Sequence, residues 1–183
     1  GLSTRVDQWV IEHTLAFMDA NRRALPGLRL AINLSPVSLS RSQFPQEVEA
    51  LLQAYNIEPW QIIFELTENY ALSNPELVCQ TLEHLRALGC RVAIDDFGTG
   101  YSSLGMLSQM PADIVKIDRL FISSIHENSF HQSFINAVIQ LCHSVGIRVC
   151  VEGVEEQEEL KVVRDIQADN IQGFYFSRPV EKR

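Results

Sequence analysis

Apolar and polar positions fall into two kinds of block along the chain. Six short segments are rich in β-branched or aromatic residues and end in polar ones, a pattern that is typical of strands. They cover residues 28–35, 62–68, 91–98, 114–119, 148–154 and 171–177. Between most of these segments, apolar residues recur at helical spacing, so the chain is predicted to alternate strands with helices.

The predicted helices have recognisable start and stop residues. The first repeats apolar residues over 6–18, behind Ser3 or Thr4 as the N-cap. Two further helices, over 77–88 and 134–145, end at Gly89 and Gly146, because glycine tolerates the left-handed backbone of a helix stop. The other two helices follow Pro45 and Glu155.

The spacing of the strands predicts a parallel sheet. Strands recur about every 20 to 35 residues, the scale of one strand plus its crossover helix. Repeated βα units of this kind build a parallel sheet, either open or closed into a barrel. Because no linker, low-complexity run or shift of composition divides the chain, we expect a single domain over residues 1–183.

Side-chain alternation along the strands favours a barrel. One face is large and apolar throughout, as helices require, whereas the other mixes small residues with polar ones placed late in each strand. An open doubly wound sheet would bury those polar groups under helices. We therefore predict a modified TIM-type (β/α)8 barrel. It would be incomplete here, with about six βα units of the usual eight, so two units precede this segment or the sequence starts inside a domain.

Composition and charge argue against several classes of protein function. Lys and Arg total 15 against 23 Asp and Glu, a net charge of −8 that argues against binding DNA through its phosphates. The four cysteines form no C-x-x-C pair and lie in apolar runs, so we interpret them as reduced core residues. Since no apolar run approaches a membrane span and no signal peptide opens the chain, we expect a cytoplasmic protein without membrane contact.

Polar side chains at the strand ends predict a metal site. Because the carboxyl ends of parallel strands share one edge, these side chains should converge there. Carboxylates so placed repel one another unless cations neutralise them, and oxygen donors favour Mg²⁺ or Mn²⁺ over zinc. Two such ions could clamp a phosphodiester. The candidates are Asn33, Glu65, Asp95, Asp96, Lys116, Asp118 and Glu152.

Each candidate also has a simpler interpretation. Glu68 could cap the next helix or face solvent, and Asn33 could be a turn residue. The Asp95-Asp96 pair could merely start a turn, and Lys116 with Asp118 could form an internal ion pair. The five histidines follow no ligand spacing, so we assign them to the surface or the core.

Several motifs together resemble the EAL-domain family of cyclic di-GMP phosphodiesterases. They occur in the order of the family and cover essentially the whole chain. The matching segments are Asn33-Leu34-Ser35, Glu65-Leu66-Thr67-Glu68, Asp95-Asp96-Phe97-Gly98-Thr99-Gly100-Tyr101-Ser102-Ser103-Leu104, Lys116-Ile117-Asp118, Glu152-Gly153-Val154-Glu155 and Gln172-Gly173-Phe174.

The resemblance implies an enzyme that hydrolyses cyclic di-GMP to linear pGpG with Mg²⁺ or Mn²⁺. It implies that one metal is bound by Asn33, Glu65 and Asp95, and that Asp95 bridges to a second metal held by Asp96 and Glu152. Lys116 would position the water nucleophile, and Glu68 would hold the loop over 97–104. The resemblance also implies water contacts for Asp118, Glu155 and Gln172, a catalytic part for Glu152 and Glu155, and hinges at Gly98 and Gly100.

The sequence departs from the family at one important point. The family's N-terminal strand with Glu-Ala-Leu and a following arginine is missing, which leaves the first metal site incomplete, so we expect weak or absent hydrolysis. The alternative is a noncatalytic receptor for cyclic di-GMP that acts through dimerisation. Exposed edges near 28–35 and 171–177 predict a homodimer or strand-exchanged oligomer. We also expect sensory or GGDEF-type domains upstream in the parent protein.

Overall fold

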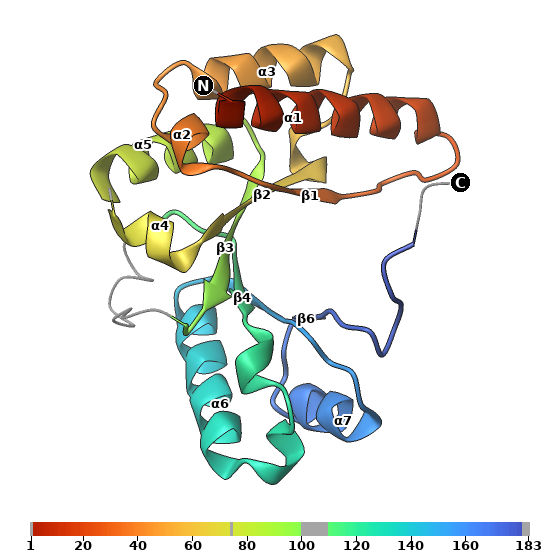
Figure 1. The fold of residues 1–183 in the computed structure, drawn as a ribbon, viewed down its shortest axis with the longest axis vertical. Coiled ribbons are helices and arrows are strands. Elements are labelled where there is room, and N and C mark those ends of the chain that lie inside the picture. The colour runs from red at the N-terminus through yellow and green to blue at the C-terminus, as the bar shows by residue number, and fades with distance from the viewer. Residues whose placement is uncertain (1, 74, 100–109, 181–183) are drawn as a thin grey trace. The chain divides into compact units, whose positions relative to one another are not determined.

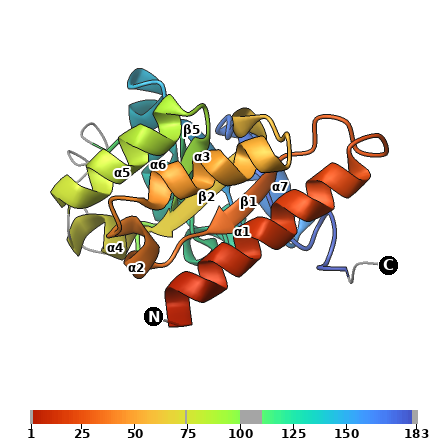
Figure 2. The same ribbon diagram turned by 90° about the horizontal axis from the view of Figure 1, so that it is seen from above.

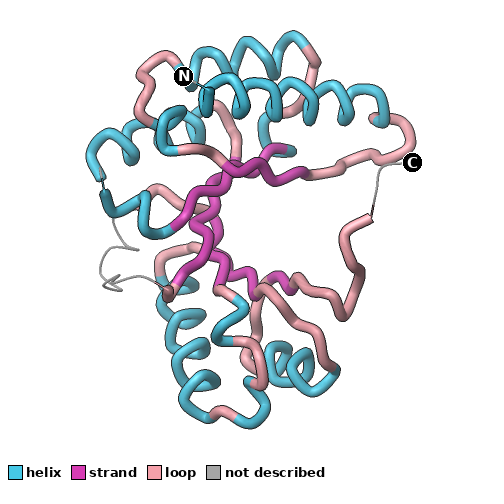
Figure 3. Tube along the Cα trace, in the orientation of Figure 1, coloured by secondary structure: helices cyan, strands magenta, loops and turns pink. Residues whose placement is uncertain are grey.

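The structure is a computed structural model that describes residues 2–73, 75–99 and 110–180. Helices and strands alternate along the chain (Figures 1 and 3), and the order of the strands in the sheet follows their order in the sequence. The chain divides into two compact units, Gly1–Ala93 with Met110–Ala112 and Ile94–Gln109 with Asp113–Arg183. Among the described helices, none has the length and apolarity to cross a lipid bilayer.

The first unit is a parallel strand pair covered by helices. Strands β1 and β2 pair in register, with Asn33 opposite Glu65 at their carboxyl ends. Helices α1 and α3 lie side by side over these strands (Figure 2). The elements are α1 (Leu2–Asn21), β1 (Leu30–Asn33), α2 (Pro36–Leu39), α3 (Phe44–Ala54), η1 (Pro59–Gln61), β2 (Ile62–Thr67), α4 (Glu68–Ser73), α5 (Pro75–Ala87) and the start of β3 (Arg91–Phe97).

The second unit begins within β3 and carries three further strands. β4 pairs in parallel with β5, with Lys116 opposite Cys150, and β5 pairs in parallel with β6. The elements are β4 (Ile114–Ile117), η3 (Arg119–Phe121), η4 (Ile125–Glu127), α6 (Ser129–Ser144), β5 (Arg148–Val151), α7 (Gln157–Asp165) and β6 (Asn170–Ile171).

The apolar face predicted from side-chain alternation forms the core. Each strand from β1 to β5 carries large residues of this face that are at most 2% exposed: Ile32, Phe64, Val92, Ile94, Val115, Ile117, Val149 and Val151. Each such side chain contributes about 1.5–3 kcal/mol when it is buried. The burial of these side chains against the helices fixes the orientation of each strand. The polar residues of the opposite face therefore point away from the helices.

Three local predictions were wrong. The strand expected over 171–177 is only Asn170–Ile171, and the chain then turns, with the Phe176 N–H donating to the Gly173 carbonyl at 3.1 Å. A Cβ on Gly173 would lie 2.0 Å from the Val154 carbonyl oxygen, so this backbone contact replaces strand pairing. Ser3 and Thr4 lie within α1 and not ahead of it, and Glu68 begins α4 and does not end β2.

The four cysteines form no disulfide, as predicted, but they differ in burial. Cys90 and Cys142 are buried, whereas Cys79 and Cys150 are half-buried. Burial raises the pKa of the Cys90 thiol to about 12. Burial and the nearby Asp169 carboxylate raise the pKa of Cys142 to about 11. The core assignment is therefore confirmed for these two thiols.

A side-chain anchor joins the end of α6 to β5 and β6. Asp169 Oδ2 lies 2.8 Å from His143 Nε2 and accepts a hydrogen bond from the Val149 N–H at 2.7 Å. Partial burial works to raise the pKa of Asp169. The hydrogen bonds from Val149 and His143, with the charges of His143 and Arg148, outweigh it, so the pKa is lowered overall.

Thiol labelling tests the burial of the cysteines. In the native protein at pH 8, we expect Cys90 and Cys142 to react with a disulfide reagent at least about a hundredfold more slowly than Cys79 and Cys150, because only the thiolate attacks. All four should react in denaturant. Peptide mass mapping identifies the labelled thiols, and fast native labelling of Cys90 or Cys142 would contradict the prediction.

The anchor predicts a pH-dependent stability. Asp169→Asn should lower the free energy of unfolding at pH 7 by about 1 kcal/mol, a modest value because the group is partly exposed. Because the pKa of Asp169 is lowered in the folded protein, its carboxylate stabilises the fold at pH values above the unfolded-state pKa near 3.8. This stabilisation is lost as the pH falls through the folded-state pKa. The difference from wild type in urea denaturation should therefore shrink from pH 7 toward pH 3. Asp165→Asn, on the exposed end of α7, is the control.

Candidate functional site

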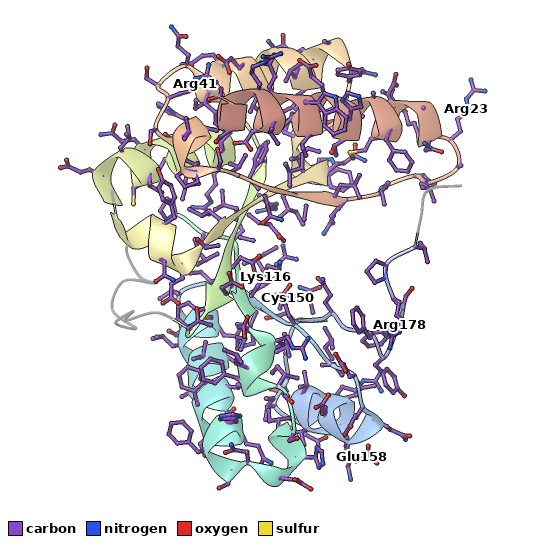
Figure 4. All side chains as sticks on the ribbon, in the orientation of Figure 1. Arg23, Arg41, Lys116, Cys150, Glu158 and Arg178 are labelled. Carbon is purple, nitrogen blue, oxygen red and sulfur yellow. The ribbon has the colours of Figure 1, made fainter. Side chains whose placement is uncertain are left out.

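A buried lysine in the second unit holds two carboxylates. Lys116 Nζ lies 3.2 Å from Asp95 Oδ2 and 2.8 Å from Glu152 Oε1, and Lys116 is 7% exposed. Figure 4 labels Lys116 on β4 near Cys150, its register partner on β5. Burying an ammonium is costly unless opposite charges compensate it. The two carboxylates supply that compensation, so these three residues form one charged group.

Regular strand geometry places this group. Asp95 lies on β3, Lys116 on β4, and Glu152 directly follows β5. The Glu152 N–H donates to the Ile117 carbonyl at 3.1 Å, which extends the parallel hydrogen-bond ladder one residue past β5. Alternation along β3 and β4 turns Asp95 and Lys116 away from the buried apolar face. The hydrogen-bond ladder and the side-chain alternation together determine the positions of Asp95, Lys116 and Glu152.

Asp96 interrupts the alternation of β3. Its φ of 55° is left-handed, which is uncommon for a residue other than glycine. Its N–H donates to Asp95 Oδ1 at 3.0 Å, and its carbonyl accepts from the Thr99 hydroxyl at 2.8 Å. The Asp118 carboxylate lies close enough to repel the charge of the Asp96 side chain. Asp96 thus starts a turn that ends at Thr99, while both aspartates still belong to β3.

Negative charge is concentrated at Asp96. Burial, followed by repulsion from the Asp95 and Asp118 carboxylates, raises the pKa of Asp96, and the Lys116 charge only partly opposes this. A divalent cation would relieve the repulsion, and the donors are carboxylate oxygens, which suit a hard ion. Among the residues that the structure describes, no group of three or more His, Cys, Asp or Glu side chains is arranged so that it could hold a metal ion. The donor chemistry fits a divalent metal, while Lys116 neutralises Asp95 and Glu152.

The first unit contributes its own polar strand ends. Asn33 and Glu65 are partners in the β1–β2 register, and the Leu34 N–H donates to the Glu65 carbonyl at 2.8 Å. Glu65 is 7% exposed, whereas Asn33 is exposed. Glu68 is only 3% exposed at the start of α4, so the solvent-facing interpretation of this residue is wrong.

The remaining candidates are less enclosed. Glu155 is exposed, with Oε1 3.9 Å from an Arg119 nitrogen. Gln172 is held by its backbone, which donates to the Val151 carbonyl at 2.8 Å and accepts from the Val154 N–H at 3.2 Å, while the residue as a whole is exposed. Gly98 has φ +97°. Gly100 lies outside the described residues.

Sequence reasoning missed two buried carboxylates that hold loops beside the strand ends. Asp7 Oδ2 accepts from the Ser35 hydroxyl at 2.5 Å and from the Ser38 hydroxyl at 2.6 Å, which secures the turn after β1. Glu159 is 4% exposed and accepts from the Glu155 N–H at 2.9 Å. The spacing of Glu159 from Glu156, its capping partner, is a signal that could have identified it.

Comparison with known proteins places the chain in a family. The EAL domain model matches residues 1–179. The cyclic di-GMP phosphodiesterase PdeF of Escherichia coli K12 is 46% identical over 98% of this chain, which spans only 24% of that protein. The cyclic di-GMP phosphodiesterase RocR of Pseudomonas aeruginosa is 34% identical over 90% of this chain, which spans 43% of RocR.

Solved structures agree with these relatives. PaMucR phosphodiesterase in a c-di-GMP complex superposes with a TM-score of 0.90 at 30% identity, covering 98% of this chain and 73% of that one. Klebsiella pneumoniae BlrP1 in a manganese and cyclic di-GMP complex superposes with a TM-score of 0.87 at 34% identity, covering 96% of this chain and 44% of that one. The TIM-barrel-like fold expected from the strand pattern is thereby confirmed. Because the match to the family spans nearly the whole sequence, this chain belongs to the EAL domain family.

Proposed function

We propose that this chain is the phosphodiesterase segment of a larger signalling protein and hydrolyses one phosphodiester bond of cyclic di-GMP to give pGpG. One observation carries the proposal: a buried lysine from β4 lies between carboxylates from β3 and from the end of β5. The names of PdeF and of the MucR complex supply the substrate class. The chain spans less than half of the curated relatives named above, 24% of PdeF and 43% of RocR, so the whole protein's activity is part of the proposal.

The proposed metal ligands follow the family motif. Asn33, Glu65 and Asp95 would hold one Mg²⁺ or Mn²⁺, and Asp95, Asp96 and Glu152 would hold a second. Bound dications would neutralise phosphate charge and make water a stronger nucleophile. The crowded negative charge at Asp96 and the manganese in the BlrP1 complex support this assignment.

The chain's own residues would orient the reactants. Lys116 would donate a hydrogen bond to the attacking water, and Asp95 and Glu152 would fix the direction of its ammonium. Glu155, Asp118 and Gln172 would complete the hydrogen bonds around the water. Proximity of this kind works only if the carboxylates and the lysine keep their positions within a fraction of an ångström. Glu68 would hold the loop over 97–104, of which 100–104 lie outside the described residues, with Gly98 and Gly100 as its hinges.

A receptor that binds cyclic di-GMP without cleaving it is the second candidate. The tripeptide Glu49-Ala50-Leu51 of this sequence lies inside helix α3, so it is not the strand-borne Glu-Ala-Leu motif of the family.

We propose further partners on the same basis. β1 and β6 are the outermost strands in the sheet order, so each has an edge that a second copy could pair with, as a homodimer or strand-exchanged oligomer. Light scattering after size exclusion should give at least a dimer mass, and a clean monomer would contradict this. Sensory or GGDEF-type domains in the parent protein, and a cytoplasmic location consistent with free thiols, complete the proposal.

Calorimetry with cyclic di-GMP, with and without Mg²⁺ or Mn²⁺, decides between the two candidates when chromatography follows pGpG in the same samples. Metal-dependent product supports the phosphodiesterase. Binding without product supports the receptor, and the absence of both overturns the two proposals together.

Removing the lysine tests its assigned part. Lys116→Met should lower the rate of pGpG formation by about a hundredfold or more, because an oriented donor is lost and two carboxylates are left to repel each other. Lys161→Met on the exposed face of α7 is the charge-matched control and should keep the wild-type rate. Equal rates for Lys116→Met and wild type would contradict the assignment.

A further inference from the structure

Two glycines beside the charged group pack against one short turn, η3. A Cβ on Gly98 would lie 2.7 Å from Phe121 Cε2 and 3.4 Å from Phe134 Cζ. A Cβ on Gly153 would lie 2.3 Å from Arg119 Cβ. Real Cβ atoms do not approach other atoms this closely, so the backbone at both glycines touches the side chains of this turn directly. The turn therefore contacts the segments that follow Asp95-Asp96 and Glu152.

The turn itself is firmly held. Asp118 Oδ1 accepts from the Leu120 N–H at 2.8 Å, and the Phe121 N–H donates to the Asp118 carbonyl at 3.1 Å. Phe121 stacks on Phe134 of α6, with ring centroids 4.7 Å apart, and meets the His131 ring edge-on at 5.5 Å. Aromatic pairs of this geometry add about 0.5–1.5 kcal/mol beyond the area that they bury. Helix α6 thus braces the ring that covers Gly98.

The two carboxylates that precede Gly98 repel each other. Asp95 and Asp96 are adjacent residues whose side chains are both carboxylates, so like charges lie close together at the end of β3. Repulsion between the two carboxylates favours any movement that separates them. Asp96 also has a strained left-handed backbone, and a loop without restraint would release that strain. Gly98 follows only two residues after Asp96, so a ring packed on Gly98 limits that movement.

We propose that Phe121 is a positioning residue: its ring, braced by Phe134, packs on Gly98 and keeps the Asp95 and Asp96 carboxylates in place for a divalent cation. This inference rests on the proposed function for its catalytic consequence, and on the packing alone for its structural part. A displacement of about 1 Å in such a group can cost on the order of a hundredfold in rate. Phe121 acts through the loop and touches neither substrate nor metal.

The central test compares Phe121→Ala with Leu120→Ala. Leu120 lies in the same turn, but its side chain is 66% exposed, so it is a matched control. We expect Phe121→Ala to weaken Mn²⁺ binding, measured by electron paramagnetic resonance with the metal alone, by about tenfold. Leu120→Ala should bind like wild type. Equal affinities for Phe121→Ala and wild type, or an equal loss in both variants, would overturn the proposal.

A double-mutant cycle tests the brace. Phe134→Ala should weaken Mn²⁺ binding by about threefold, and adding it to Phe121→Ala should cause no further loss, because Phe134 acts through Phe121. Additive losses would overturn the assigned route. Should Phe121→Ala unfold, Phe121→Leu keeps most of the buried volume and should show a smaller loss of the same kind at a wild-type thermal midpoint.

Hydrogen exchange separates this inference from the proposed function. Phe121→Ala should speed amide exchange of residues 96–99 by at least about tenfold without metal, and Leu120→Ala should not. Unchanged exchange overturns the packing claim whatever the activity. A wild-type chain that neither binds Mn²⁺ nor forms pGpG overturns the proposed function and the catalytic consequence, whereas the exchange result still decides whether Phe121 holds the loop.

Discussion

The ammonium of Lys116, held between Asp95 and Glu152, is the interaction on which the arrangement of the second unit's polar residues depends. A buried cation is tolerated only with opposite charges at hydrogen-bond distance. The lysine therefore fixes where β3, β4 and the end of β5 must place their acidic residues. The same compensation keeps carboxylates close together that would otherwise repel, and closeness of carboxylates is what a divalent cation requires.

Backbone features sharpen this arrangement where strand geometry ends. Asp96 adopts φ 55°, which ends the alternation of β3, and its side chain lies near the Asp118 carboxylate. Gly98 and Gly153 then admit the side chains of Phe121 and Arg119 to within contact distance. These positions tolerate no larger residue, so the glycines serve close packing as well as turning. The end of β3 thus continues into Gly98, whose backbone packs against the ring of Phe121.

The apolar pattern predicted the six strands and the five longer helices, because periods of two and of 3.6 are set by backbone geometry, but not the short helices α2 and α4. It also predicted the face of each strand, since Phe64, Val115 and Val149 are fully buried as alternation requires. It failed over 172–177, where aromatic residues resemble a strand but Gly173 packs on the Val154 backbone. That contact joins residues 19 positions apart, which no local pattern contains.

By itself, the sequence determined the order of βα units, the buried face and the acidic residue types at the strand ends. The family motifs indicated which of these acidic residues are candidate metal ligands. Only the tertiary structure decided that Lys116 pairs with Asp95 and Glu152, that Asp7 secures the turn after β1, and that Phe121 covers Gly98. The physical reason is that periodicity depends on neighbours along the chain, whereas charge compensation and close packing depend on neighbours in space.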